Sequence, residues 1–360
     1  MLFTTPPRMV LATSVGRASS VIKRTLEISR EPAHLSVRDE QLILKRNGQI
    51  VGQVPCEDIG IILVDHPQTT YTHGALAKLA EFDAAVVICG RDHLPVAILL
   101  PIADHSQVVW RLDAQLKVSR PLAKQLWKQV VVAKIEAQAR NLSADQPAHR
   151  KLLALAREVR SGDPSNIEAQ AAKVYWANWL ATTDNDELET ERFRRDPKGT
   201  GLNNFLNYGY AVVRAAVARA IVAAGLLPSL GIHHRNRSNP FCLADDLIEP
   251  LRPLVDDRVR ELHRQGYEEL NQPAKAALLE ILADRVALGV GEENTGPLMV
   301  QIHRYVASLV RCYTGDAREL QIPIVWEGEA PAEPYSGAVN GSARVSPSLT
   351  PEYRGRDGHC

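Results

Sequence analysis

The chain has 360 residues, 45% hydrophobic and 23% charged, which is ordinary for a soluble globular protein with room for two domains. No run approaches the roughly 20 apolar residues of a membrane-spanning helix. Lys plus Arg (42) equal Asp plus Glu (42), so bulk charge gives no argument for a nucleic-acid partner. The cysteines are scattered and never form C-x-x-C, which argues against a disulfide framework and a structural zinc site. We expect a cytoplasmic protein.

The first 20 residues are predicted to be a disordered extension. Their apolar run, Met9–Ala12, is too short for a secretory signal core, and no small-residue cleavage site follows it. From 21 to 104 the pattern predicts a compact β-rich domain with one helix over His73–Phe82. Asn47-Gly48 is a strong two-residue hairpin signal between the strand-like segments Gln41–Lys45 and Ile50–Val54. The other segments of strand type are Leu35–Arg38, Ile59–Val64, Ala84–Cys89 and Val96–Leu100.

A linker over 105–118 is expected to lead into an all-α domain over 119–326. Apolar residues near the helical repeat predict helices throughout this second domain. The predicted helical segments are Arg120–Leu142, Arg150–Arg160, Pro164–Ala181, Gly201–Gly225, Pro240–Leu262, Pro273–Val290 and Leu298–Cys312. Residues 327–360 are rich in Gly, Pro, Ser and Ala and are predicted to be a disordered tail. The predicted fold class is therefore α+β, with a small N-terminal β-rich domain before a larger helical one.

Glu168 lies where a carboxylate is difficult to accommodate. Asp163 and Pro164 are predicted as N-cap and first helical residue, which places Glu168 in the early turns of a helix. Its helical face also carries Ala171 and Tyr175. A carboxylate on such a face needs a cation, a metal or a raised pKa, and the alternative is a half-exposed position at the edge of the stripe.

A second group of candidate ligands begins 66 residues after Glu168. His234 lies in a loop whose Asn239 and Pro240 are predicted to open the next helix. On that helix Asp246 and Glu249 are three residues apart and share a face, whereas Asp245 is turned about 100° away. One imidazole with two carboxylates suits Mg²⁺ or Mn²⁺. The alternative is a solvated acidic pair, which is common on helices.

Local clusters of basic residues permit DNA binding without establishing it. Each cluster has the alternative of being a solvated loop or helix face. The DNA-binding candidates are Arg192, Arg194, Arg195, Lys198, Arg235 and Arg237.

Four blocks in this order and spacing resemble the CRISPR adaptation integrase family Cas-one, a CRISPR-associated endonuclease. The resemblance covers about 21 to 323 and is closest to the type II branch, with type II-C favoured. The four blocks are Asn166–Ala172, Asn203–Tyr210, Gly225–His234 and Leu243–Pro250.

The resemblance implies a catalytic metal held by Glu168, His234 and Glu249, with Asp246 as an additional acidic residue. Family spacing, and not chemistry, prefers His234 over His233. It also implies a reaction in which the 3′-hydroxyl of a short captured DNA attacks a phosphodiester at the edge of a CRISPR repeat, and endonuclease activity when water attacks instead. The implied partners are double-stranded DNA, a second copy of the chain through the β domain, and the small Cas-two protein.

Two other functions are compatible with parts of the sequence. A catalytically inactive DNA-binding scaffold would be expected to have lost a ligand, and all three candidates are present. A prenyl-diphosphate enzyme is suggested by Asp245-Asp246-x-x-Glu249, but it requires a second metal motif on a facing helix, which the later helices do not offer. If the type II resemblance holds at the start, Val21 is the expected initiator, and peptides from residues 1–20 in the native protein would refute this hypothesis.

Overall fold

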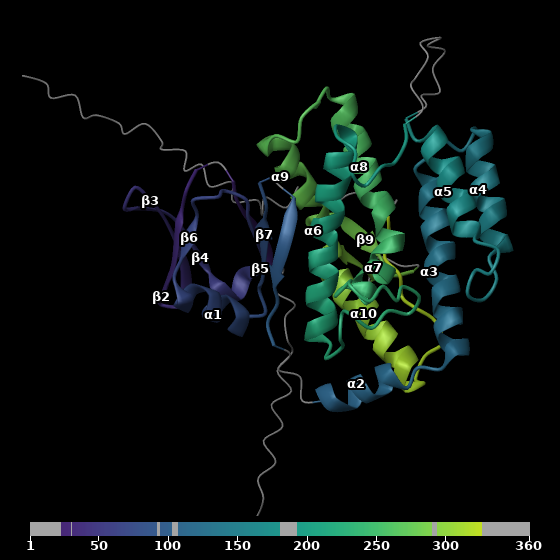
Figure 1. Ribbon diagram of the computed structural model, residues 1–360, viewed down its shortest axis with the longest axis horizontal. Helices are drawn as coiled ribbons and strands as arrows, with labels where there is room; N and C mark the ends of the chain where they lie inside the picture. The colour runs from purple at the N-terminus through teal and green to yellow at the C-terminus, as the bar shows by residue number, and fades with distance from the viewer. Residues whose placement is uncertain are drawn as a thin grey trace, which may run out of the picture.

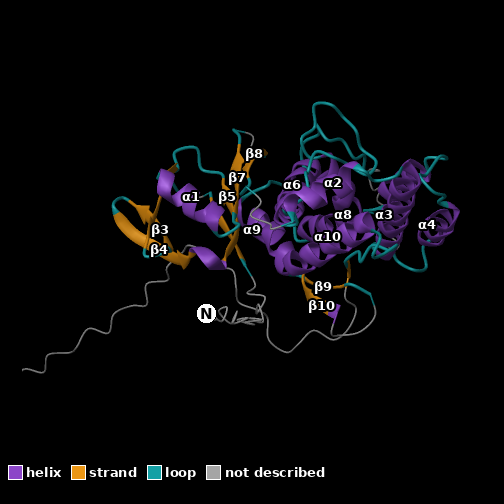
Figure 2. Ribbon diagram, turned by 90° about the horizontal axis from the view of Figure 1, so that it is seen from below, coloured by secondary structure: helices purple, strands orange, loops and turns teal. Residues whose placement is uncertain are grey.

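The computed structural model describes residues 23–29, 31–91, 94–102, 107–180, 193–289 and 294–325. The segments predicted to be disordered, 1–20 and 327–360, lie outside these residues. Two β-sheets and one helix occupy the N-terminal end, and most of the helices pack at the other end (Figures 1 and 2). The predicted α+β class is confirmed.

The outer N-terminal sheet has the strand order β4-β3-β2-β6. Its strands are β2 (His34–Arg38), β3 (Gln41–Arg46), β4 (Gln49–Pro55) and the short β6 (Thr70–Tyr71). Antiparallel β3 and β4 are joined by Asn47 and Gly48, whose φ angles are 49° and 79°. Two positive φ angles in a two-residue loop are typical of a type I′ turn. The predicted hairpin is confirmed.

The inner sheet connects the two ends of the molecule. Its order is β1-β5-β7-β8, with β1, β5 and β7 parallel and β8 antiparallel. The strands are β1 (Arg24–Ile28), β5 (Ile59–Val64), β7 (Ala85–Cys89) and β8 (Pro95–Leu99), and α1 (His73–Glu81) precedes β7. Ile62 packs in the N-terminal core with Leu79 of α1, whereas Ile61 and Leu63 pack in the helical core. Since both faces of β5 are covered, its continuous apolar run is explained.

The helical region is arranged around α6, whose buried residues run along most of its length. Gly209 lets α6 pass close to the helix that carries Val255, because a Cβ at position 209 would lie 2.4 Å from Val255 Cγ1. The helices are α3 (Arg120–Arg140), α4 (Pro147–Glu158), α5 (Ile167–Asn178), α6 (Leu202–Ala223), α7 (Cys242–Ile248), α8 (Arg252–Arg264), α9 (Gln272–Glu280) and α10 (Leu298–Thr314). A 3₁₀ turn, Glu249–Leu251, joins α7 to α8.

The expected linker over 105–118 contains a helix, α2 (Val108–Leu116). It is fixed to the helical region by polar side chains: Arg111 donates to the Ala224 carbonyl at 2.8 Å and Gln115 donates to the Leu227 carbonyl at 3.0 Å. Because its anchoring depends on these long-range hydrogen bonds and not on an apolar stripe, hydrophobic spacing did not reveal it.

Two predicted helix starts are wrong. The α5 helix begins at Ile167, because Asp163 and Asn166 adopt positive φ angles of 45° and 50° that interrupt a helix. Asp163 still caps it from outside, accepting hydrogen bonds from the Ile167 and Glu168 amides at 2.8 and 3.0 Å. The α7 helix begins at Cys242, since Asn239 instead accepts the Phe241 amide in a turn.

The helical region also contains a small sheet with the order β10-β9-β11. The helix that was predicted to continue to Val290 ends at Glu280, and a 3₁₀ turn over Ile281–Ala283 leads into this sheet. Its strands are β9 (Arg285–Ala287), β10 (Thr295–Pro297) and β11 (Ile324–Val325). Among the described helices, none combines the length and apolar character that crossing a bilayer requires.

Candidate metal centre

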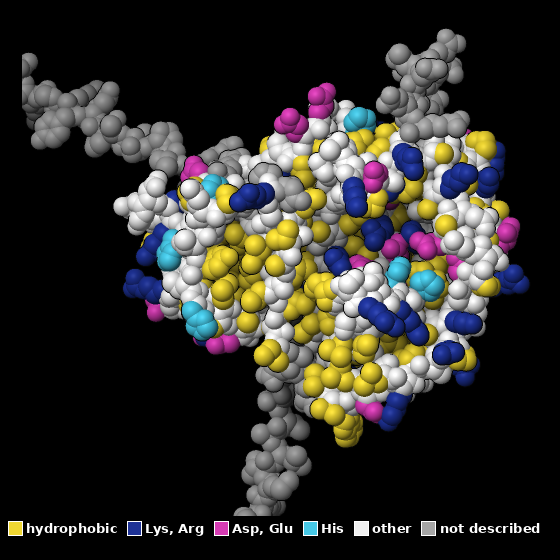
Figure 3. Space-filling view, viewed as in Figure 1, with side chains coloured by type: hydrophobic (Ala, Val, Ile, Leu, Met, Phe, Trp, Pro, Cys, Tyr) yellow, Lys and Arg dark blue, Asp and Glu magenta, His cyan; other side chains and the backbone are white. Residues whose placement is uncertain are grey.

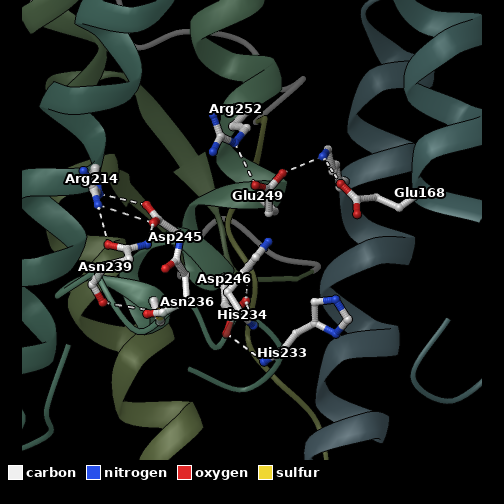
Figure 4. Close-up of polar contacts among 12 residues, drawn as sticks. Glu168, Arg214, His233, His234, Asn236, Asn239, Asp245, Asp246, Glu249 and Arg252 are labelled. Carbon is white, nitrogen blue, oxygen red and sulfur yellow. Dashed lines mark hydrogen bonds and ion pairs between the residues drawn. The ribbon is translucent and has the colours of Figure 1, made fainter. Parts of the chain in front are cut away.

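Four elements bring the candidate residues together (Figure 4). Glu168 comes from the first turn of α5, His234 from the loop before α7, Asp246 from α7 and Glu249 from the turn after it. The α3 helix packs against both α5 and this turn. Segments far apart in the sequence therefore meet at one place in the helical region.

Glu168 and Glu249 converge on one ammonium group. Lys134 Nζ of α3 lies 2.5 Å from Glu168 Oε1 and 2.5 Å from Glu249 Oε2. The Lys134 side chain is 10% exposed, so the three charges share a largely desolvated space. Although burial opposes ionisation of Lys134, the two carboxylates outweigh it and raise its pKa.

Glu249 has a second cationic partner. Arg252 Nε donates to its Oε1 at 2.9 Å, so each carboxylate oxygen contacts a different cation. Burial alone would favour the neutral acid, but the charges of Arg252 and Lys134 prevail and lower the pKa of Glu249 to about 2. Glu249 is therefore an anion throughout the physiological pH range.

The two adjacent histidines have different environments. His234 Nδ1 lies 2.6 Å from Asp246 Oδ1, and this hydrogen bond raises the His234 pKa. His233 stacks on Trp127 of α3 with a centroid distance of 4.1 Å and an interplanar angle of 4°. Burial lowers the His233 pKa. In Figure 4 the His233 ring points away from Glu249 toward α3.

Asp246 holds the histidine loop in place. Its carboxylate is fully buried and accepts the His233 and His234 amides at 2.9 and 3.1 Å. Gly231 allows this approach, since a Cβ there would lie 2.4 Å from the His234 carbonyl and 2.8 Å from Asp246 Oδ2. Because the Asp246 carboxylate accepts a hydrogen bond from Nδ1–H, Nε2 is the His234 nitrogen that can face a ligand.

Asp245 belongs to a different network. It forms an ion pair with Arg214 at 2.8 Å and accepts a hydrogen bond from Asn239 at 2.6 Å. The Arg214 guanidinium also lies 4.8 Å from the centroid of the Phe241 ring. Asp245 and Asp246 therefore serve different partners, as their 100° separation on a helix predicts.

The predicted DNA-binding residues differ in availability. Arg194, Lys198, Arg235 and Arg237 are exposed. Arg195 is half-buried and donates to Asn203 and Asn207, so its guanidinium is engaged within the fold. Arg192 lies outside the described residues. Figure 3 shows histidine, acidic and basic side chains gathered on one face of the helical region.

Several residues of the site were not predicted. Lys134, Trp127 and Arg252 each contact a candidate ligand or its neighbour. Lys134 left a usable signal, since it follows Val130 by one helical turn on the buried face of α3. A lysine on an apolar stripe requires a buried anion, just as Glu168 requires a cation.

The arrangement does not form a closed ligand set. Across the described ranges, no three His, Cys, Asp or Glu side chains lie close enough together to hold one metal ion. The structure brings Glu168 and Glu249 to one cation, and it brings His234 to Asp246. Lys134 occupies the position between the two glutamates.

Comparisons with known proteins agree on one family. The family model described as CRISPR associated protein Cas1 matches residues 26–274. The CRISPR-associated endonuclease Cas1 of Neisseria meningitidis is 38% identical over 294 residues, covering 80% of this chain and 92% of that protein. The CRISPR-associated endonuclease Cas1 2 of Pyrobaculum aerophilum is 30% identical over 251 residues, covering 66% of this chain and 81% of that protein.

Solved structures share the fold at low sequence identity. A casposase bound to its integration product has a TM-score of 0.67 at 19% identity, covering 82% of this chain and 92% of the casposase. A Cas1 protein from Thermotoga maritima has a TM-score of 0.64 at 17% identity, covering 81% of this chain and 97% of that one. The family match and the identity to the Neisseria protein extend over most of the chain, which belongs to the Cas1 family of CRISPR-associated endonucleases and integrases.

Proposed function

We propose that this chain is the integrase of a CRISPR adaptation complex that joins short foreign DNA to CRISPR repeats by metal-dependent transesterification. Endonuclease products arise when water attacks in place of the DNA 3′-hydroxyl. Family membership supports the reaction class. The structural observation that carries the proposal is the convergence of Glu168 and Glu249 on one cation beside the Asp246–His234 pair.

The donor types of the candidate side chains suit a hard divalent cation, and the position between Glu168 and Glu249 is taken by the Lys134 ammonium. Cas1 endonucleases are generally metal-dependent. Carboxylate oxygens with one imidazole suit Mg²⁺ and Mn²⁺, of which Mn²⁺ tolerates nitrogen better. We assign Glu168, His234 and Glu249 as the ligands, with Asp246 as the residue that orients His234. When bound, such an ion lowers the pKa of the attacking hydroxyl and stabilises charge that develops on the phosphate.

The chain's own residues prepare this site. Arg252 fixes the orientation of Glu249 at 2.9 Å, and the Asp163 carboxylate caps the helix turn that carries Glu168. The exposed Arg235 and Arg237, close in sequence to His234, are positioned to contact DNA phosphates. Together these contacts hold reactive groups in place before DNA binds, which lowers the reorganisation that the reaction requires.

The proposed partners are double-stranded DNA, a Cas2 protein and a second copy of this chain. This fold is shared by a chain of a solved Cas6-RT-Cas1–Cas2 complex and by a chain of a solved Cas1–DNA complex. The edge strand β8 and helix α2 expose Val96 (66%), Val109 (72%) and Trp110 (78%), which supports an apolar self-association surface. Light scattering of Val96→Asp should show a loss of dimer, and an unchanged mass would reject this surface. Placement in the type II-C branch is a proposal that rests on the sequence resemblance.

The family match gives no support to a prenyl-diphosphate enzyme. Engagement of Asp245 by Arg214 also removes one acid from that motif. The comparisons give no support to a catalytically inactive scaffold either, and an activity measurement tests that alternative directly.

The test is a strand-joining assay with the purified chain, its locus Cas2 protein, a labelled short duplex and a plasmid that carries the native leader and repeat. We expect label to enter the plasmid with Mn²⁺ or Mg²⁺ and not with EDTA. Intact DNA binding without any transfer would favour the scaffold. Transfer that survives EDTA would reject the metal assignment.

A further inference from the structure

The Lys134 ammonium lies where a bridging cation would lie. It contacts Glu168 Oε1 and Glu249 Oε2 at 2.5 Å each, and both contacts join α3 to other elements. Lys134 is also the one cation that pairs with Glu168 among the residues that the structure describes. Glu249, by contrast, keeps Arg252 as a second partner.

Without Lys134, two carboxylates would face each other across a poorly solvated space. Two carboxylates close enough to share one ammonium group repel each other strongly where little water screens them. The lysine therefore explains how Glu168 and Glu249 can be held together in the absence of a metal. It also occupies the space between them, so lysine and divalent cation compete for the same oxygens.

We propose that Lys134 is a resident counter-ion that holds Glu168 and Glu249 together until a divalent cation takes its place. This inference rests on the proposed metal-dependent function. Lys134 is a positioning residue in this scheme, because it acts on the ligands and not on DNA.

The local charge favours a divalent ion that replaces the Lys134 ammonium over one that binds beside it. Glu168 and Glu249 pair with the two cations Lys134 and Arg252, while the nearby Asp246 pairs with His234. The two carboxylates are already matched by Lys134 and Arg252, so a divalent ion added beside the lysine would leave two excess positive charges, whereas an ion in place of the lysine would leave one. The ammonium can withdraw because it sits on a flexible four-carbon stem and Glu168, its partner, is 27% exposed.

The experiment measures Mn²⁺ binding to the full chain from the electron paramagnetic resonance signal of free Mn²⁺. We expect Lys134→Met to bind Mn²⁺ at least about tenfold more tightly than wild type, because it removes a competing charge of the ion's own sign. Lys134→Gln, a smaller polar replacement, should shift the affinity in the same direction. Lys124→Met is the matched control, since it removes an exposed lysine about three turns away on the same helix.

Thermal unfolding supplies a second readout that does not depend on activity. In EDTA, Lys134→Met should unfold at a lower temperature than wild type, because the two glutamates lose their shared cation. Mn²⁺ should raise the unfolding temperature of Lys134→Met more than that of wild type.

The outcomes separate this inference from the proposed function. Binding of Mn²⁺ to wild type with equal or weaker binding to both Lys134 variants would overturn the counter-ion and leave the metal-dependent function standing. Absence of Mn²⁺ binding in wild type and in both variants would overturn the metal assignment itself, and the counter-ion with it.

Discussion

The N-terminal sheets and the helical region bury different kinds of side chain. Among the described residues up to 102, Asp65 is the one buried charged side chain, and it pairs with Lys275 of α9. The helical region buries Lys134, Asp246, Glu249 and Asp256 within connected or neighbouring networks. Figure 3 shows a broad hydrophobic area toward the sheet side of this face, with basic, acidic and histidine side chains along its edge and over the helices.

The apolar N-terminal core and the charged helical interior contribute differently, the first to stability and the second to function. A buried apolar side chain stabilises the fold directly. A buried charge costs free energy unless it is paired, and a buried ion pair is weak evidence for stability. Since the helical region accommodates several buried charges around Glu249, they are better explained by a function than by folding. The inner sheet supports this region through β5, whose Ile61 and Leu63 pack in the helical core.

The largest expected effect is the loss of strand joining in Glu249→Gln. The change keeps the shape of the side chain and removes the charge shared by Lys134 and Arg252. We expect joining to fall by more than the roughly 10- to 100-fold that follows the loss of an outer-shell partner. The measurement is the initial rate of label transfer per folded molecule. A rate within a factor of two of wild type would remove Glu249 from the ligand set.

Asp246→Asn should have a smaller effect, because Asp246 acts through His234. The two oxygens of Asp246 accept different loop amides, so an asparagine keeps only one of these acceptors and holds both the loop and the imidazole less firmly. We expect joining and Mn²⁺ affinity to fall about 10- to 100-fold. Asp245→Asn, which alters the pair with Arg214, is the neighbouring control. An equal loss in both variants would show a general disturbance of α7 and not a specific role for Asp246.

Ile62→Ala tests whether the N-terminal core contributes to stability without contributing to strand joining. Ile62 is fully buried in the N-terminal core, so truncation should cost about 2–5 kcal/mol of unfolding free energy. Joining per folded molecule should stay near wild type, since Ile62 packs in the N-terminal core and not in the helical core. Denaturant unfolding and the joining rate give the two numbers. A strong loss of joining with an intact fold would mean that the sheet takes part in the chemistry.

Asp256 is expected to make the stability of the fold depend on pH. Burial raises the pKa of Asp256 to about 7, although Tyr210 and Tyr175 donate hydrogen bonds that oppose the rise. An unfolded Asp titrates near 4, so the folded protein binds the extra proton between these values. Asp256 therefore stabilises the fold below pH 4, and this contribution is lost as pH rises through about 7. Thermal unfolding between about pH 5 and pH 8 should show the loss.

Asp256→Asn is the control for this pH effect. The amide does not titrate, so the unfolding temperature of the variant should decline less with rising pH than that of wild type. Parallel pH profiles in the two proteins would mean that Asp256 is ionised throughout, with Tyr210 and Tyr175 stabilising its charge.

The sequence predicted correctly those elements whose conformation depends on residues close together in the chain. The Asn47-Gly48 turn and the apolar run of β5 were predicted correctly because positive φ angles and two-sided burial leave direct signals. The α2 helix was missed because its anchors, the Ala224 and Leu227 carbonyls, are more than 100 residues away. The start of α5 was misplaced because Asp163 caps it from outside.

The candidate ligands followed from spacing and family resemblance, but their partners did not. Glu249 and Asp246 share a helical face, which the sequence shows. The pairing of Asp246 with His234, and the stacking of His233 on Trp127, depend on how the loop folds against α3. The ligand assignment itself is a proposal that these contacts support.

The most direct test of the site compares the two adjacent histidines in the strand-joining assay. His234→Ala should abolish transfer, as Glu168→Ala and Glu249→Ala should. His233→Ala should retain transfer, since it loses a stacking contact with Trp127 and no proposed ligand. Transfer that persists in His234→Ala, or that is lost equally in both histidine variants with intact folds, would contradict the metal centre proposed for this protein.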